Sequence, residues 1–309
     1  MSKWSSHRRR TGPPGCGLKG GRVWSAKLFA ILLITFHVWP PAPCAADDLR
    51  PDLDRVYRET GADTLRAFVF LPPKQDSVQQ ANAILLFHGG GWSSGSAEWT
   101  FPAARRFAEA GLVAIAFEYR LARGEVTPIE ALDDACSAVA WTRARSEEFG
   151  LSGRIAGYGV SAGGHLITAA ATLGCQDGDA NLEALLLWSP ALDLVNDRWF
   201  VGLLQGRATA TELSPARHVG STTPPTSIVH GELDTLTPLR GVERYCAALQ
   251  EVGGICDLHA YPGVGHLLTR NLKNQESDFD PDPEARSDGI ARHLLFLESL
   301  GFLDAPKAR

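Results

Sequence analysis

The chain of 309 residues has 44% hydrophobic, 21% charged and 8% aromatic residues, which excludes a disordered, collagen-like or coiled-coil protein and corresponds to one large domain or two small ones. No apolar run approaches the roughly 18 residues that span a bilayer, so a polytopic membrane protein is excluded as well. The net charge of −5 conceals a basic N-terminus: residues 47–309 carry 23 basic and 35 acidic side chains, a net charge of −12 that makes nucleic acid an unsuitable partner.

Residues 1–46 have the three-part pattern of an export signal. A basic stretch is followed by a 12-residue apolar run at 28–39 and then by small residues that end at Ala46, before Asp47. We therefore expect general-pathway export to the periplasm or the exterior, with cleavage after Ala46. Because the basic region is long for a signal peptide, an uncleaved anchor, which alone would place the protein at a membrane, and a misplaced start codon are the alternatives.

Residues 47–309 show one continuous pattern, in which apolar runs of strand length alternate with amphipathic helical patterns. The predicted strands are 65–71, 83–87, 113–119, 155–158, 184–188, 227–229 and 256–261. The predicted helices are 103–110, 129–149, 162–173, 239–252 and 290–300. This alternation predicts one α/β domain with a mostly parallel sheet and helices on both faces.

Two segments break the alternation, at 193–225 and 270–289. The first is irregular and the second is polar and acidic, so both are predicted to be loops or lids over one end of the sheet. Ligands of such sheets bind beyond the carboxyl ends of the strands, so chemistry is expected in the residues that follow each strand.

The stretch Gly159-Val160-Ser161-Ala162-Gly163 places a serine between a predicted strand and a predicted helix. This G-x-S-x-G pattern is typical of a nucleophile elbow, a turn so tight that the residues two positions from the serine must be nearly free of side chain. The turn exposes the hydroxyl and directs the N-terminus of the following helix toward developing negative charge. We therefore predict Ser161 as a nucleophile, with a plain glycine-rich turn as the alternative.

A run of glycines, His88-Gly89-Gly90-Gly91, follows the strand predicted at 83–87. Three successive glycines let the backbone approach a substrate and direct N–H groups at one point, as a tetrahedral acyl intermediate requires. A flexible loop or a phosphate cradle are the alternatives, but no Lys-Ser/Thr pair follows, so a P-loop is excluded.

Together the two motifs resemble those of the hormone-sensitive-lipase-type branch of the α/β-hydrolase superfamily. Trp92 and the sequence Glu118-Tyr119-Arg120 make the chain more similar still to secreted esterases of the feruloyl/acetyl-xylan esterase-like group. The resemblance covers about residues 50–302 and implies the α/β-hydrolase fold with an eight-stranded sheet. It also implies an oxyanion hole formed by the N–H groups of Gly89, Gly90 and Ala162, with Gly91 as a substitute.

A nucleophilic serine needs a histidine base that is itself oriented by a carboxylate, and in this fold the chain order is serine, acid, histidine. His266 lies in a glycine-rich loop after the last predicted strand and is the candidate base. Asp234 follows the strand at 227–229 and matches the family's acid position. Glu232 and Asp193 are its rivals, and a surface carboxylate that caps the next helix is the other interpretation of Asp234.

Four cysteines remain once the leader is removed, and an even number in an oxidising compartment permits two disulfides. Cys246 and Cys256 lie across a Gly253-Gly254 turn that joins a helix to a strand, which favours this pair. Cys136 and Cys175 then pair by elimination. Four buried, reduced cysteines are the alternative.

Other polar and aromatic residues have structural interpretations. His88 and His165 are expected to support the loop and the helix beside them, and residues 118–120 to brace the sheet edge. Asp133-Asp134 is expected to interact with a helix dipole. Core or rim packing is expected for the tryptophans, with stacking on a sugar or aryl group as the alternative; these are Trp92, Trp99, Trp188 and Trp199.

These patterns predict a secreted serine carboxylic-ester hydrolase that needs no cofactor and no metal. The resemblance implies small-molecule or polysaccharide substrates, with short acyl, acetyl or feruloyl esters of carbohydrates foremost. A lipase or peptidase of the same fold and a catalytically inactive binding module are the alternatives. The sequence gives no indication of oligomeric state.

Overall fold

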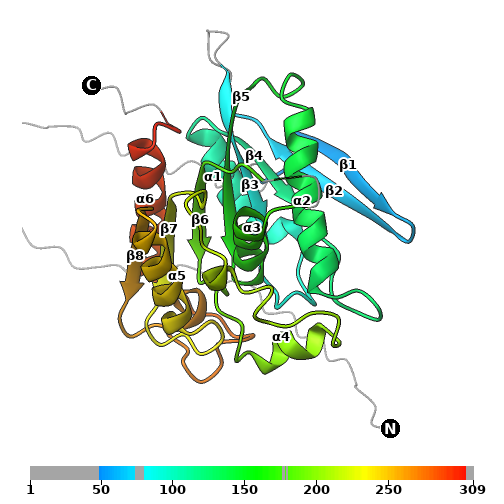
Figure 1. Ribbon diagram of the computed structural model, residues 1–309. Helices are drawn as coiled ribbons and strands as arrows, with labels where there is room; N and C mark the ends of the chain where they lie inside the picture. The colour runs from blue at the N-terminus through cyan, green and yellow to red at the C-terminus, as the bar shows by residue number, and fades with distance from the viewer. Residues whose placement is uncertain (1–48, 74–79, 176–177, 179, 304–309) are drawn as a thin grey trace, which may run out of the picture. The chain divides into compact units, whose positions relative to one another are not determined.

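The computed structural model describes residues 49–73, 80–175, 178 and 180–303, so the predicted signal peptide, residues 1–46, lies outside the described residues. Within them, eight strands form one sheet in the order β1-β2-β4-β3-β5-β6-β7-β8 (Figure 1). β2 is antiparallel to β1 and β4, and all other neighbours are parallel. The strands are β1 (Leu53–Thr60), β2 (Asp63–Phe70), β3 (Ala81–Phe87), β4 (Val113–Phe117), β5 (Leu151–Val160), β6 (Ala184–Trp188), β7 (Thr226–Gly231) and β8 (Cys256–Tyr261).

Helices cover both faces of this sheet. They are α1 (Phe101–Glu109), α2 (Pro128–Ala144), α3 (Ala162–Leu173), α4 (Arg198–Leu203), α5 (Leu239–Glu251) and α6 (Pro283–Ser299). Buried residues of α2, α3 and α5 form one hydrophobic cluster with one face of the sheet, and those of α1 and α6 form a second cluster with the other face. The predicted α/β-hydrolase architecture, a mostly parallel eight-stranded sheet between two helical layers, is therefore confirmed.

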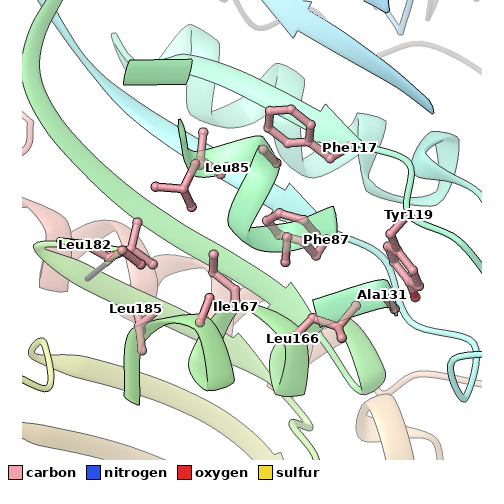
Figure 2. Packing of buried hydrophobic residues seen from close by; sticks show 14 of the residues in the cluster. Leu85, Phe87, Phe117, Tyr119, Ala131, Leu166, Ile167, Leu182 and Leu185 are labelled. Atoms are coloured by element: carbon pink, nitrogen blue, oxygen red, sulfur yellow. The ribbon is translucent and has the colours of Figure 1, made fainter. Parts of the chain in front are cut away.

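The central strands carry apolar side chains on both faces because both faces are covered. Leu85 and Phe87 of β3 belong to the cluster with α3, whereas the alternate residue Leu86 belongs to the other cluster. Figure 2 shows Leu85 and Phe87 packed together with Leu166 and Ile167 of α3. This double burial holds the ends of β3 and β5 rigidly, and the candidate site is built at those ends.

Several element predictions were wrong in detail, and the segment predicted as irregular at 193–225 contains the helix α4. β1 was not predicted, because in this edge strand only Tyr57 is buried and no apolar run marks it. α2 ends at Ala144 rather than 149. α6 begins at Pro283, inside the segment predicted as loop, since the Asp282 side chain accepts the N–H groups of Glu284 and Ala285 and proline suits the first helical position.

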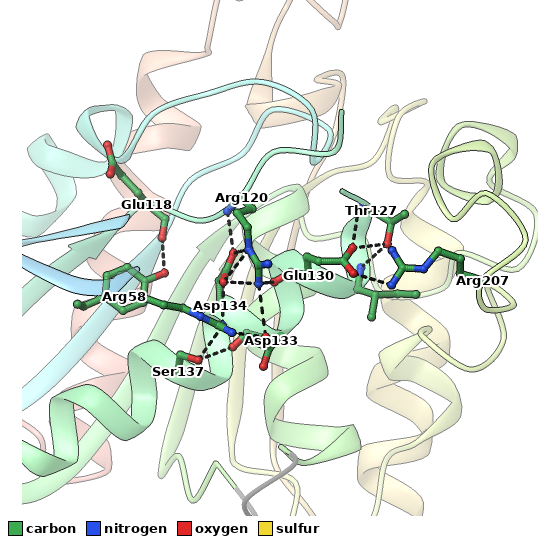
Figure 3. Close-up of polar contacts among 11 residues, drawn as sticks. Arg58, Glu118, Arg120, Thr127, Glu130, Asp133, Asp134, Ser137 and Arg207 are labelled. Carbon is green, nitrogen blue, oxygen red and sulfur yellow. Dashed lines mark hydrogen bonds and ion pairs between the residues drawn. The ribbon is translucent and has the colours of Figure 1, made fainter. Parts of the chain in front are cut away.

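Asp133 and Asp134 do not interact with the dipole of a helix N-terminus, because they lie beyond the first turn of α2. Instead both carboxylates pair with Arg58 of β1 and Arg120, which follows β4 (Figure 3). Asp134, with a fully buried side chain, lies 2.8 Å from a guanidinium nitrogen of each arginine. Glu118 accepts the Arg66 N–H at 3.0 Å. These contacts tie β1, β2, β4 and α2 together, as expected for a brace at the sheet edge.

The acidic residue at the N-terminus of α2 is Glu130. It forms a capping box with Thr127 and accepts a hydrogen bond from Arg207 at 2.6 Å (Figure 3). The sequence did not single out this residue, although the spacing Thr-x-x-Glu is a recognised capping signal.

Both predicted cysteine pairs are joined, Cys136 to Cys175 and Cys246 to Cys256. The first links α2 to the residues after α3, and the second links α5 to β8. Among the described helices, none has the length and apolar character needed to cross a membrane. Likewise, the described residues contain no group of three or more His, Cys, Asp or Glu side chains that could hold a metal ion.

Candidate active site

The predicted site residues follow the carboxyl ends of parallel strands. Ser161 follows β5, the run 88–91 follows β3, Asp234 comes shortly after β7 and His266 comes shortly after β8. Because β3, β5, β6, β7 and β8 are consecutive parallel neighbours, their carboxyl ends lie at one edge of the sheet.

Ser161 occupies a strained turn between β5 and α3. Its φ of 52° and ψ of −115° are unfavourable for a residue with a side chain. A side chain on Gly163 would overlap the Phe87 carbonyl oxygen, and one on Gly159 would overlap the backbone of Gly163. These glycines therefore allow the turn, while a hydrogen bond from the Ser161 N–H to the Trp188 carbonyl at 2.9 Å fixes it to β6.

Gly89 lies directly beside this serine. A Cβ on Gly89 would be 3.3 Å from the Ser161 Cβ, so the glycine run passes close to the serine side chain. Ala162 is the first residue of α3, and its N–H is among those at the helix N-terminus that have no partner within the helix. Two of the residues predicted to form the oxyanion hole, Gly89 and Ala162, thus lie next to the predicted nucleophile.

The carbonyl groups of the glycine run are held by hydrogen bonds. The Tyr119 hydroxyl donates to the His88 carbonyl oxygen at 2.9 Å, and the Gly89 carbonyl oxygen lies 2.6 Å from His88 Nδ1. The Gly90 carbonyl oxygen accepts from the backbone N–H and hydroxyl of Ser94, at 3.0 and 2.9 Å. The N–H of a trans peptide points opposite to its C=O. The N–H groups of residues 89–91 are thus directed away from these bonds, and none donates to another described residue.

His88 and His165 support the loop as expected. Burial lowers the pKa of His88 to about 4, so the ring is neutral, and its contact with the Gly89 carbonyl places the proton on Nδ1. Burial also lowers the pKa of His165 to about 4. Its Nδ1 accepts from the Trp92 indole at 3.1 Å, and its Nε2 donates to the Leu213 carbonyl at 2.8 Å.

Asp234 and His266 form a buried pair. His266 Nδ1 lies 2.8 Å from Asp234 Oδ2, and the residues are 4% and 5% exposed. Burial by itself raises the pKa of Asp234, but the hydrogen bond and charge of His266 and the N–H of Thr237 hold it below its ordinary value. An ionised carboxylate at Nδ1 keeps the imidazole proton on that nitrogen, which leaves Nε2 as the proton acceptor.

The rival acids lack this contact. Asp193 pairs instead with Arg217 and Arg244, and Glu232 is an exposed residue. Asp234 is also no surface carboxylate, since it is 5% exposed. Within the described residues there is no hydrogen bond between the Ser161 hydroxyl and His266, so the structure joins the acid to the base but does not show the serine bonded to the base.

Two further residues hold this pair through hydrogen bonds and a third lies beside it, and the sequence did not indicate these contacts. The Thr237 hydroxyl donates to Asp234 Oδ2 at 2.8 Å. Gln275 Oε1 accepts the His266 N–H at 2.8 Å, so part of the segment predicted as a lid braces the histidine loop. His230 is buried 3.6 Å from Asp234, and burial lowers its pKa. A threonine, a glutamine and a strand histidine carry no motif, so these contacts emerge only from the fold.

Comparison with known proteins places the chain in a family. Residues 84–270 match the family described as alpha/beta hydrolase fold, and the chain belongs to that family. It is 34% identical over 149 residues to the carboxylesterase NlhH of Mycobacterium tuberculosis, a match that covers 46% of each protein. The chain therefore matches only about half the length of this curated relative.

Solved structures resemble a larger part of the chain. The thermophilic esterase Est2 of Thermogutta terrifontis is 27% identical with a TM-score of 0.73, over 84% of this chain and 96% of that one. Its propionate-bound form is also 27% identical, with a TM-score of 0.72 over 84% of this chain and 98% of that one. These relatives are all described as esterases.

Proposed function

We propose that the protein is a serine carboxylic-ester hydrolase. The observation that carries this proposal is the buried hydrogen bond between Asp234 and His266 at the sheet edge where Ser161 occupies its strained turn. An imidazole whose Nδ1 is hydrogen-bonded to a carboxylate is the arrangement that a serine nucleophile needs in its base. The esterase relatives support this class of reaction.

In the proposed reaction the Ser161 oxygen attacks the ester carbonyl carbon while His266 Nε2 takes the hydroxyl proton. The carbonyl oxygen becomes an oxyanion, which the N–H groups of Gly89, Gly90 and Ala162 stabilise. When the C–O bond breaks, His266 returns the proton to the departing alcohol, and an acyl-enzyme is left. Water, deprotonated by His266, then releases the acid by the same steps, and Asp234 stabilises the imidazolium each time.

Short acyl groups, including acetyl and feruloyl esters of carbohydrates, are the proposed substrates. The propionate-bound form of the related Est2 supports a short acyl group. The motif resemblance to feruloyl/acetyl-xylan esterases supports a carbohydrate alcohol. Gln275 also supports this assignment, because it commits part of segment 270–289 to bracing His266 rather than to forming an apolar lid.

The test compares hydrolysis of p-nitrophenyl acetate, butyrate and decanoate by the full chain and by the variants Ser161→Ala and Ser221→Ala. Ser221 is an exposed serine in a turn away from the site and serves as the matched control. We expect acetate or butyrate to be preferred, Ser221→Ala to match the wild type and Ser161→Ala to be inactive. A preference for decanoate would indicate a lipase. If the wild type neither hydrolyses any of these esters nor reacts with a fluorophosphonate probe, the protein is an inactive binding module.

We also propose that the protein is exported and cleaved after Ala46. Two disulfides support this proposal, since such bonds persist mainly in oxidising compartments. Cell fractionation and N-terminal sequencing of the purified protein test it. The expected N-terminus is Asp47 in the exported fraction, whereas an intact N-terminus in the membrane fraction would instead indicate an anchor.

A further inference from the structure

A distant part of the chain contacts the end of the glycine run. The indole Nε1–H of Trp199, on α4, donates to the Gly91 carbonyl oxygen at 3.1 Å. Figure 1 shows α4 beyond the end of the sheet toward which the parallel strands run. A Cβ on Gly91 would lie 3.3 Å from this Nε1, and the φ of Gly91 is +57°, so glycine allows the close approach. Trp199 thereby holds the fourth of four successive carbonyl groups, after those of residues 88–90.

The ring of Trp199 is held through its indole N–H, and more than half of the residue is exposed. Its neighbour Phe200 is fully buried, with ring centroids 4.7 Å from Trp92 and 5.2 Å from His165, and this packing anchors α4. Trp199 itself is 58% exposed. A ring already held by a hydrogen bond and by its helix loses little conformational entropy when a ligand stacks on it.

A second exposed tryptophan touches the other end of the same run. Trp99 is 62% exposed, and its ring centroid lies 6.1 Å from that of His88. Trp99 and Trp199 are the two most exposed large hydrophobic side chains of the described residues. Both thus lie beside the loop next to Ser161, whereas Trp92 and Trp188 are buried. Exposed aromatic surface gathered at one site indicates binding rather than packing.

We propose that Trp199 forms an aryl-binding subsite whose flat face stacks on an aromatic ring in the acyl or alcohol part of the ester. Its N–H meanwhile holds the Gly91 carbonyl oxygen and so fixes the end of the glycine run. The inference rests on the ester hydrolase activity proposed above. A planar ring gains offset stacking on indole beyond the burial of its area, and a puckered ring of the same size does not. The subsite therefore selects esters that carry a planar ring over esters that carry a puckered one.

Two pairs of esters measure the preference for a planar ring directly. Benzyl acetate and cyclohexylmethyl acetate vary the alcohol, and methyl phenylacetate and methyl cyclohexylacetate vary the acyl group. The members of a pair differ in whether the ring is flat. The ratio of their kcat/KM values is therefore the readout, measured for the wild type, Trp199→Ala, Trp199→Phe and Val201→Ala. Val201 is 48% exposed on the same helix and is the matched control.

We expect the wild type to prefer the flat member of at least one pair and Trp199→Ala to reduce that preference about fivefold. Trp199→Phe keeps a flat ring but lacks the N–H donor, so it should retain the preference and lower kcat on both members of the pair about threefold. Val201→Ala should match the wild type in both respects.

A wild type without preference for the flat ring, or the same preference in Trp199→Ala, would overturn the subsite. Unchanged kcat in Trp199→Phe would overturn the positioning role of the indole N–H. Failure of the proposed function is distinct, because the wild type would then hydrolyse no member of either pair, or Ser161→Ala would hydrolyse them equally well. Trp199→Leu, checked by thermal unfolding, replaces Trp199→Ala if the latter misfolds.

Discussion

Asp234 fixes the tautomer of the candidate base through its hydrogen bond to His266 Nδ1. Asp234→Asn preserves the shape of the side chain, but its amide can donate to Nδ1 and so favour the tautomer with the proton on Nε2. In that tautomer the imidazole cannot accept the serine proton. We expect kcat to fall by about 10³ to 10⁴ while KM changes little, measured with p-nitrophenyl acetate.

The rival carboxylates supply the controls for this substitution. Glu232→Gln changes an exposed side chain, and Asp193→Asn changes a carboxylate that pairs with Arg217 and Arg244. Both variants should retain kcat within about threefold, because neither carboxylate contacts His266. A loss of 10³ in either variant, with Asp234→Asn active, would move the role of acid to that residue.

The sequence could predict that Ser161, Asp234 and His266 lie at one edge of the sheet, because each follows a recognisable strand. It could not indicate Thr237 or Gln275. Their roles depend on which acceptor atoms the fold brings within hydrogen-bonding distance: Gln275 is nine residues from His266 along the chain, in a stretch without any pattern. Residue chemistry with a fixed backbone signature is predictable, whereas bracing by a side chain across loops is not.

The loop from β3 to α1 depends on the end of β4 for its shape. Tyr119, which follows β4, is buried and holds the His88 carbonyl at 2.9 Å. In Tyr119→Phe this carbonyl loses its donor, so the Gly89 N–H should be less well oriented, and we expect kcat to fall about tenfold.

Tyr57→Phe is the matched control for this variant, because its hydroxyl donates to the Glu118 carbonyl at 2.7 Å, away from the glycine run. We expect it to lower the free energy of unfolding by about 1 kcal/mol and to leave kcat unchanged. Equal effects of the two variants on kcat would show that Tyr119 acts only through general stability.

The network around α2 joins three strands to one helix through a buried charge. Burial raises the pKa of Asp134 although Arg120 and Arg58 oppose the shift, so the ion pairs offset desolvation of the carboxylate rather than adding much net stability. Removing one arginine leaves the buried Asp134 carboxylate with too few cationic partners. We expect Arg120→Gln to lower the free energy of unfolding by about 3 kcal/mol, measured by urea denaturation.

Arg207→Gln breaks a pair of similar length, since Arg207 lies 2.6 Å from Glu130 (Figure 3). The Arg207 side chain, however, is exposed to solvent. Its loss should therefore cost much less stability than that of Arg120. If the two variants lost the same amount, burial of Asp134 would not be the cause of the Arg120 effect.

At the scale of elements, prediction succeeded where burial on both faces produced long apolar runs, as in β3 to β6. It missed β1, whose exposed edge needs no such run. It also placed the start of α6 seven residues too late, because the Asp282-Pro283 start signal stands in a polar segment that hid it. The pairing of the cysteines was predicted from the turn that joins a helix to a strand between Cys246 and Cys256, which left Cys136 and Cys175 to pair.

The two disulfides constrain the unfolded chain by different amounts. Cys136–Cys175 spans 39 residues and joins α2 to the residues after α3, whereas Cys246–Cys256 spans 10. In the chain-entropy account a longer closed loop restricts the unfolded state more. We expect the double variant Cys136→Ala/Cys175→Ala to lose about 4 kcal/mol of unfolding free energy and Cys246→Ala/Cys256→Ala about 3 kcal/mol, by urea denaturation.

Reduction of the wild type with dithiothreitol gives an independent measurement of the same quantity. The reduced protein should lose more stability than either double variant, and reducing a variant should remove only the bridge that it retains. A larger loss from the shorter bridge would mean that contacts in the folded state, between α5 and β8, outweigh chain entropy. No loss on reduction would mean that the sheet and its two helical layers hold the fold without either bridge.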